Sequence, residues 1–133
     1  MSGATPVIVD GEKENDFKVN ISELEKAVTD KTKAIILNSP SNPTGAVYNE
    51  SELKAIAELA VRKNIIIISD EIYEKLLYNG EHISIASFGE EIKGLTIVIN
   101  GMSKAYAMTG WRIGYTASNK ELASMMDNMQ SHA

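Results

Sequence analysis

The sequence predicts an α/β fold, namely a three-layer α/β/α sandwich around a mostly parallel sheet. Two observations predict it. Short apolar runs alternate with longer amphipathic stretches along the 133 residues, which is the pattern of strands separated by helices. The composition, with 44% hydrophobic and 23% charged residues and no cysteine, is that of one soluble globular domain without disulfides. Strands joined by helices pair in parallel, and such a sheet is covered by helices on both faces.

The elements of the first third follow from spacing and from turn residues. We expect a short strand over residues 5–10, a polar loop, a helix over 21–29 and a second strand over 33–38. The strand over 33–38 is apolar on both faces, which is typical of a central parallel strand. It ends in the densest cluster of turn-forming residues in the chain, at 39–45.

The next helix has start and stop signals of its own. Apolar residues repeat at helical spacing over 53–61, and Asn49 or Ser51 stands where an N-cap is needed. Asn64 follows the last turn, where asparagine closes a helix in the left-handed conformation. The sequence therefore predicts a helix between these residues.

The remaining chain predicts three more strands and a last helix. The strands are expected over 65–69, 96–100 and 111–116. One face of the last helix carries four apolar residues, which we interpret as packing: Leu122, Met125, Met126 and Met129.

Charge and hydropathy exclude several classes of function. The net charge of −5 argues against a nucleic-acid groove or an anionic membrane surface as partner. The longest apolar runs are far too short to span a bilayer, and the first ten residues lack the pattern of a signal peptide. None of the nine glycines stands in a phosphate-binding or dinucleotide-binding motif. We expect a cytoplasmic protein.

Ligands of open parallel sheets bind at the carboxyl ends of the strands. Residues 38–45, 69–73 and 100–112 follow such ends and are rich in polar groups. Asp70 comes directly after an apolar strand, where a carboxylate either caps the following turn or pairs with a bound cation. Both interpretations stay open for the residue taken alone.

Lys104 follows the strand over 96–100, and Arg112 follows eight residues later. A lone lysine is most often a solvated surface group, whereas an amine in a pocket near another cation is a candidate nucleophile toward a carbonyl. Arg112 suits either a phosphate, as a bidentate donor, or a structural role stacked beside Trp111.

Three kinds of side chain are less informative alone. Asn42 lies between two prolines and is typical of a turn, and Tyr73 is typical of half-buried packing. His82 and His132 have no neighbours at the spacing of a metal site or of a catalytic triad.

Five of these residues together resemble, in order and spacing, the class I/II aminotransferases, enzymes of fold type I that use pyridoxal phosphate: Asn42, Asp70, Tyr73, Lys104 and Arg112. The resemblance extends from residue 5 to at least residue 130, and three segments carry it: 38–45, 69–73 and 101–115. The last is the most specific, because it holds the lysine and the arginine in the family's attachment pattern. The fold implied is the large domain of these pyridoxal-phosphate-dependent transferases.

The resemblance implies a role for each residue. Lys104 would form the Schiff base with pyridoxal phosphate and, once displaced by substrate, carry the proton between the substrate Cα and the cofactor. Asp70 would pair with the pyridine nitrogen, so that the ring can act as an electron sink. Asn42 and Tyr73 would hydrogen-bond the phenolate oxygen, and Arg112 would bind the phosphate.

Length and one position depart from the family's pattern. Members have roughly three times as many residues, more than one domain holds. We therefore expect residues 1–133 to be the central part of a large domain, with the N-terminal segment and the small domain absent, and the isolated chain to have little or no activity. The intact enzyme would be a homodimer that interconverts an amino acid, aspartate by default, and a 2-oxo acid. Some members have a phosphate-contacting serine three residues before the lysine, where this chain has Gly101.

Other functions use the same pattern. Lyases and synthases of the same fold share the five residues. A transcriptional regulator can carry an aminotransferase-like sensor domain, but a basic winged-helix segment would have to precede it, and nothing basic of that kind is present here. A domain that no longer binds the cofactor is the third alternative.

Overall fold

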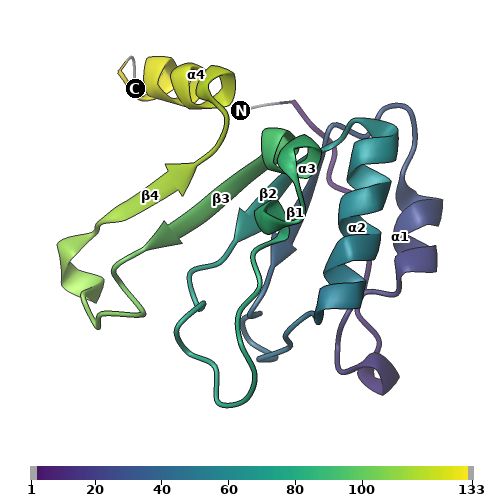
Figure 1. Cartoon of the computed structure of the whole chain (residues 1–133), viewed down its shortest axis with the longest axis horizontal. Helices are drawn as coiled ribbons and strands as arrows, with labels where there is room; N and C mark the ends of the chain where they lie inside the picture. Colours follow the sequence, from purple (N-terminus) through teal and green to yellow (C-terminus); the bar gives the residue numbers. More distant parts are fainter. Residues whose placement is uncertain (1–2, 132–133) are drawn as a thin grey trace.

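One sheet of four strands organises the computed structural model, which describes residues 3–131. The strands are β1 (Ala34–Asn38), β2 (Ile66–Asp70), β3 (Thr96–Gly101) and β4 (Gly114–Ala117), and they lie side by side in this order (Figure 1). β1, β2 and β3 are parallel, and β4 runs antiparallel to β3. Together with the flanking helices, this mostly parallel sheet confirms the predicted α/β class.

Helices connect the parallel strands. α2 (Glu50–Lys63) links β1 to β2, and α3 (Glu90–Leu95) immediately precedes β3. α1 (Ile21–Ala27) precedes β1 and lies beside α2 (Figure 1). α3 was not expected from the sequence, because six residues with a single buried side chain, Ile92, show no measurable helical period.

The hydrophobic core lies between α2 and one face of the sheet. Ile67 on β2 is completely buried, and Leu53 and Leu59 of α2 are at most 2% exposed. Ile85, in the connection that leads to α3, closes the same cluster. The face of the sheet that carries Ile67 is therefore the one that α2 covers.

Both ends of α2 form as expected. The side chain of Asn49 accepts a hydrogen bond from the backbone N–H of Glu52, and the Glu52 carboxylate accepts one from the N–H of Asn49, so the pair is a capping box. At the other end Asn64 adopts the left-handed conformation with φ of 52°. The cap residues thus fix where α2, the helix that connects β1 to β2, begins and ends.

The other face of the sheet presents a row of isoleucines. The strand register places Ile36, Ile68 and Ile97 side by side. Ile36 is 77% exposed, and Ile99 further along the same face is 37% exposed. The prediction that residues 33–38 form a central strand is wrong within residues 3–131: β1 lies at an edge of the sheet, and no further strand pairs with its outer side there.

The strand expected over residues 5–10 does not form. This segment has no regular structure, and Val7 and Ile8 are 69% and 77% exposed. A strand needs a neighbour for its backbone hydrogen bonds. No other strand in the described part of the chain lies beside it, so its apolar composition alone does not order it.

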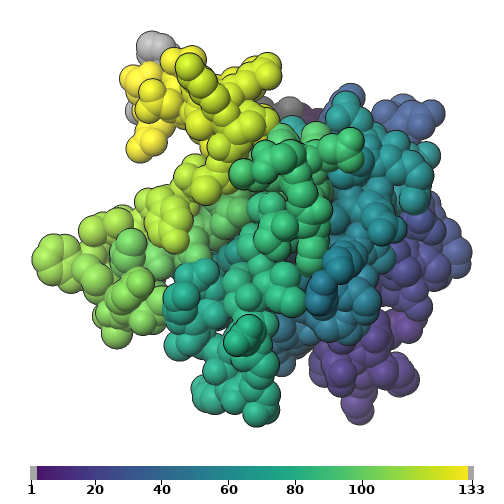
Figure 2. All heavy atoms as spheres, in the orientation of Figure 1, coloured from purple at the N-terminus to yellow at the C-terminus, as the bar shows by residue number. Residues whose placement is uncertain are grey.

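The last elements differ in detail from the prediction. β4 begins at Gly114 rather than at residue 111, because Thr109–Trp111 forms a 3-10 turn. α4 (Lys120–Gln130) forms where expected, but its methionine face does not pack: Met125 and Met129 are 55% and 76% exposed. Figure 2 shows α4 projecting from the body of the molecule, where no described element covers that face. No helix within residues 3–131 has the length and apolarity needed to cross a membrane.

Candidate active site

The carboxyl ends of β1, β2 and β3 and the start of β4 form one border of the sheet, which runs across the strands (Figure 1). This border is the sheet edge at which the candidate residues lie. The turn after β1 is tied to the end of β2. The side-chain amide of Asn38 donates to the backbone carbonyl of Asp70 (3.2 Å), and the side-chain oxygen of Asn38 accepts from the backbone N–H of Asn42 (3.0 Å). Asn42 is therefore brought to the edge where β2 ends.

Asp70 is the last residue of β2 and is half-buried. In the register it lies between Asn38 of β1 and Ile99 of β3. One carboxylate oxygen accepts a hydrogen bond from the backbone N–H of Ile72 (3.1 Å), so this side chain does cap the turn that follows the strand. The capping interpretation is confirmed, and it leaves the second oxygen of the carboxylate available to another partner.

Asn42, Tyr73 and Lys104 meet although they come from three separate segments. The side-chain amide of Asn42 donates to the phenolic oxygen of Tyr73 at 3.2 Å. The Nζ atom of Lys104 lies 5.6 Å from the centre of the Tyr73 ring, within the range of a cation–π contact. Tyr73 is half-buried, whereas Asn42 and Lys104 are exposed. The pocket expected around Lys104 is therefore an open surface in this chain.

Arg112 lies on the same β3–β4 connection as Lys104, but the two cations are not joined by any contact within residues 3–131. Its guanidinium donates to the backbone carbonyl of Thr109 (3.1 Å), and its backbone is left-handed with φ of 54°. The alternative of a stacked, ion-paired structural residue is not what the structure shows, because Arg112 and Trp111 are both exposed, and neither an ion pair nor a ring contact of Arg112 occurs in the described chain.

Gly101 ends β3 where the backbones of β3 and β4 approach closely. A Cβ atom at this position would lie 2.9 Å from the carbonyl oxygen of Ile113 and 3.1 Å from the Cα atom of Gly114. It would also meet the side chain of Ile72 at 3.3 Å. Gly101 therefore stands in a space that admits no side chain without a shift of the backbone.

The site is an exposed edge rather than a closed cavity. Two surface hollows, of about 410 and 300 Å³, lie elsewhere, one beside α2 and α3 and one beside α1 and the start of α2. None of the five candidate residues lines either of them. Four of the five gather at the sheet edge through contacts or strand register, and Arg112 reaches it only through its place in the β3–β4 connection.

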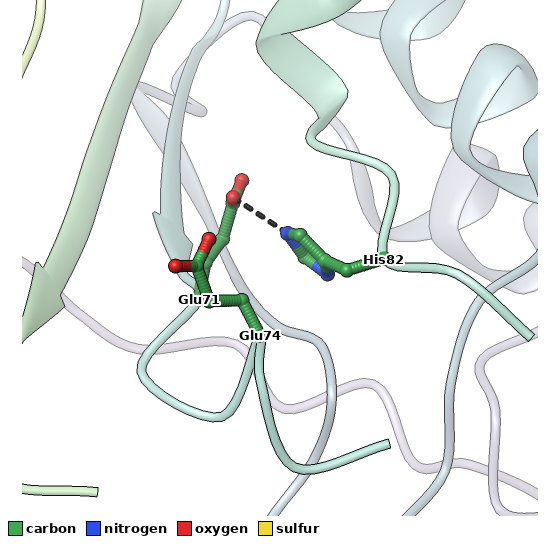
Figure 3. A group of neighbouring side chains, drawn as sticks. All are labelled: Glu71, Glu74 and His82. Atoms are coloured by element: carbon green, nitrogen blue, oxygen red, sulfur yellow. Dashed lines mark hydrogen bonds and ion pairs between the residues drawn. The ribbon is translucent and has the colours of Figure 1, made fainter. Parts of the chain in front are cut away.

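A second cluster near this edge was missed by the sequence analysis. Glu71, Glu74 and His82 lie close together, with ligand atoms within 4.8 Å of one another (Figure 3). In the sequence, no residue accompanies His82 at the spacing of a metal site or of a catalytic triad. His82 comes eleven positions after Glu71, so only the folded loop brings them together, and the sequence carries no periodic signal for the pair. His132 lies outside the described residues.

Known proteins match the sequence of this chain over its whole length. The family described as aminotransferase class I and II matches residues 1–133. The chain belongs to this family. It is 54% identical over 134 residues to an aspartate aminotransferase of Bacillus sp. (strain YM-2), which covers 100% of this chain and 34% of that protein. A probable aspartate/prephenate aminotransferase of Aquifex aeolicus (strain VF5) is 48% identical over 132 residues, covering 98% of this chain and 34% of that protein.

Solved aminotransferase structures have the same fold. A double mutant of the Thermus thermophilus aspartate aminotransferase superposes with a TM-score of 0.91 at 43% identity, covering 96% of this chain and 32% of that one. The aromatic aminotransferase of Pyrococcus horikoshii OT3 gives a TM-score of 0.88 at 45% identity over 92% of this chain. This aminotransferase chain thus spans about a third of the length of the relatives it matches.

Proposed function

We propose that this aminotransferase chain supplies the cofactor-binding centre of a pyridoxal-phosphate-dependent enzyme, with Lys104 as the residue that attaches the cofactor. One observation carries the proposal. Asn42, Tyr73 and Lys104, which lie far apart in the sequence, are joined by a 3.2 Å hydrogen bond and a 5.6 Å cation–ring contact at the edge where Asp70 ends β2. Membership of the family supports the same assignment.

The donor set fits pyridoxal phosphate group by group. A primary amine suits the aldehyde, a carboxylate suits a protonated ring nitrogen, an amide with a phenol suits the phenolic oxygen, and a guanidinium suits the phosphate. The second carboxylate oxygen of Asp70, free of the bond to Ile72, is available for the ring nitrogen. When bound, the cofactor supplies an electron sink that stabilises negative charge at the substrate Cα.

The residues of the chain then have distinct tasks. Asp70 holds a proton on the ring nitrogen, because a carboxylate at hydrogen-bond distance favours the charged form of that nitrogen. Asn42 and Tyr73 orient the ring through its phenolic oxygen. Lys104 Nζ, once released from the cofactor, would accept the proton from the substrate Cα as a general base and deliver it, as a general acid, to the cofactor carbon that carried the aldehyde. Arg112 binds the phosphate as a fork of two donors.

Apart from Arg112, which is assigned to the phosphate, this chain has no arginine at the sheet edge for the substrate carboxylate. The chain has two arginines, and the second, Arg62, lies near the end of α2, which leads to the amino end of β2. It forms an ion pair of 2.6 Å with Glu25 of α1. Arg62 therefore lies at the opposite edge of the sheet from Lys104, so we propose that an arginine outside this third of the enzyme holds the substrate carboxylate.

We propose an amino acid and a 2-oxo acid as the substrates, with aspartate as the default donor. Several relatives carry the name aspartate aminotransferase, among them those of two Bacillus strains. The name of the Pyrococcus horikoshii structure denotes an aromatic aminotransferase at a similar identity. We therefore propose that residues outside this third of the enzyme select the side chain of the amino-acid substrate.

A chimera tests this function. The matching third of the Bacillus sp. aspartate aminotransferase is replaced by this chain, which is 54% identical to it, and glutamate formation from aspartate and 2-oxoglutarate is measured. We expect the chimera to retain activity within about 100-fold of the Bacillus enzyme, since a misplacement of about 1 Å in a reacting group costs a factor of this size. The control is the unmodified Bacillus enzyme prepared in the same way.

Product analysis separates the alternatives. Glutamate formed in step with loss of aspartate supports amino-group transfer. A chimera that folds and binds the cofactor but forms no glutamate contradicts the proposal, and release of ammonia or cleavage of a carbon–carbon bond by the full-length protein would assign the chain to a lyase or synthase.

A further inference from the structure

Glu71 is a buried carboxylate that the proposed chemistry does not use. Its side chain is 4% exposed, and both of its oxygens accept hydrogen bonds. One oxygen accepts from the hydroxyls of Ser69 (2.9 Å) and Ser84 (2.8 Å), and the other faces the Nε2 atom of His82 at 2.8 Å. Because a carboxylate only accepts, the Nε2 atom of His82 carries a proton in this arrangement.

The cluster is not built to hold a metal ion. Glu71, Glu74 and His82 are close enough for one, but the three donors on Glu71 all come from the chain itself. A cation would have to displace the His82 contact. The free-energy cost of burying the Glu71 carboxylate is already offset by three charge-assisted hydrogen bonds. The side chain of Glu74 forms only a 3.8 Å ion pair with its neighbour Lys75 within residues 3–131.

The bonds of Glu71 close the base of a loop. β2 ends one residue before Glu71, whose backbone N–H donates to the carbonyl of Ile99 in β3 (2.9 Å). The chain then leaves the sheet as the segment 72–81, whose tip residue Tyr78 is fully exposed, and returns at His82 and Ser84. Figure 3 shows His82 reaching across this loop to Glu71. The side chain of Glu71 therefore joins the segment that leaves the sheet to the segment that returns to it.

Tyr73 lies on the outgoing side of this loop, two residues after Glu71. Few other bonds hold the segment: the backbone N–H of Leu76 donates to the carbonyl of Tyr73 (2.8 Å), and that of Glu74 donates to the carbonyl of Glu71 (2.9 Å). Without the side-chain bonds of Glu71, the backbone bonds of Glu71 and Ile72 would still hold the outgoing side, but the returning side at His82 and Ser84 would lose its bonds to Glu71, and the base of the loop would open more readily.

We propose that Glu71 is a positioning residue: through His82 and Ser84 it closes the loop 72–81 and holds Tyr73 between Asn42 and Lys104. The inference rests on the proposed function, in which Tyr73 and Asn42 orient the cofactor, but the placement itself exists without any ligand. Glu71 thus links its buried hydrogen bonds with Ser69, Ser84 and His82 to the exposed candidate site that contains Tyr73.

Nuclear magnetic resonance of the ¹⁵N-labelled 133-residue chain, without cofactor, tests this placement. The side-chain amide of Asn42 reports its bond to Tyr73, and Tyr73→Phe gives the signal of the broken bond. In Glu71→Ala we expect the Asn42 amide signal to move at least halfway to that reference. The hydrogen-bonded amides of Glu74 and Leu76 should exchange with solvent about tenfold faster or more, as expected when charge-assisted bonds at the loop base are lost.

Three further variants make the result specific. Glu71→Gln keeps an acceptor for the two serines and should restore the Asn42 signal. Glu74→Ala removes the neighbouring carboxylate, which has no bond to Glu71 or His82 within residues 3–131, and should change neither the Asn42 signal nor the exchange of the Leu76 amide. His82→Ala retains the serine bonds, so it folds even if Glu71→Ala does not, and should shift the Asn42 signal in the same direction by a smaller amount.

Two outcomes would overturn the inference. A lower melting temperature in Glu71→Ala and His82→Ala with an unchanged Asn42 signal would show that the network only stabilises the fold. An equal shift in Glu74→Ala would show that any charge change nearby has the effect. If these signals behave as expected while Lys104 fails to take up pyridoxal phosphate, the positioning stands and the proposed function fails, so the two are separable.

Discussion

Replacing Lys104 by alanine in the active chimera is expected to lower the rate of amino-group transfer at least about 100-fold, the size of a single general acid–base contribution. The loss follows because Lys104 Nζ both attaches the cofactor and carries the proton at the substrate Cα in the proposed mechanism. Steady-state kinetics with aspartate and 2-oxoglutarate measure it. The loss should fall on kcat, because the proton transfer occurs after substrate is bound.

Lys93→Ala is the matched control. Lys93 is also an exposed lysine, but it lies on α3 and pairs with Glu90 at 3.1 Å, away from the sheet edge. Its replacement should leave the rate unchanged within a factor of about two, as expected of a surface change with an effect below about 0.5 kcal/mol. A Lys104→Ala enzyme that keeps more than a tenth of the activity would remove Lys104 from the chemistry.

Ile67→Ala is expected to destabilise the chain by about 2–5 kcal/mol. Ile67 is completely buried between β1, β3 and α2, so the shortened side chain leaves a cavity in the centre of the core. Urea unfolding, monitored by circular dichroism, measures the change. If the free energy of unfolding depends on urea concentration with the same slope in both proteins, the surface exposed on unfolding is the same.

Ile36→Ala provides the comparison on the opposite face of the same sheet. Ile36 is 77% exposed on the edge strand β1, so its truncation should cost less than about 1 kcal/mol. Equal losses for the two variants would mean that the isoleucine row of Ile36, Ile68 and Ile97 is buried in solution, for example against a second molecule.

Most of the fold could be predicted because its signals are local. The period of α2, its Asn49 cap and the left-handed Asn64 are set by neighbouring residues, and all three form as expected. The failures have a different origin. Residues 5–10 and the methionine face of α4 depend on partners that the described chain does not contain, and apolar composition alone cannot say whether a partner is there. α3 is too short to show a period.

The residues of the candidate site could be predicted from local signals as well, whereas the contacts between them could not. The turn residue Asn42, the strand-end residue Asp70 and Lys104 could be found because each follows a predicted strand, and parallel strands end at one edge. The geometry between them, such as the Asn42–Tyr73 bond, is tertiary. The Glu71–His82 pair is tertiary as well: it forms where the loop 72–81 returns to the sheet, so no spacing in the sequence predicts it.

Labelling of the purified 133-residue chain tests the central claim most directly. The chain is incubated with pyridoxal phosphate, reduced with borohydride and digested, and the modified lysine is located by peptide mass. The proposed half-site predicts a single adduct at Lys104, absent in Lys104→Ala and present in Lys93→Ala. Adducts scattered over the eleven lysines, with no preference for Lys104, would contradict a preformed cofactor site in this chain.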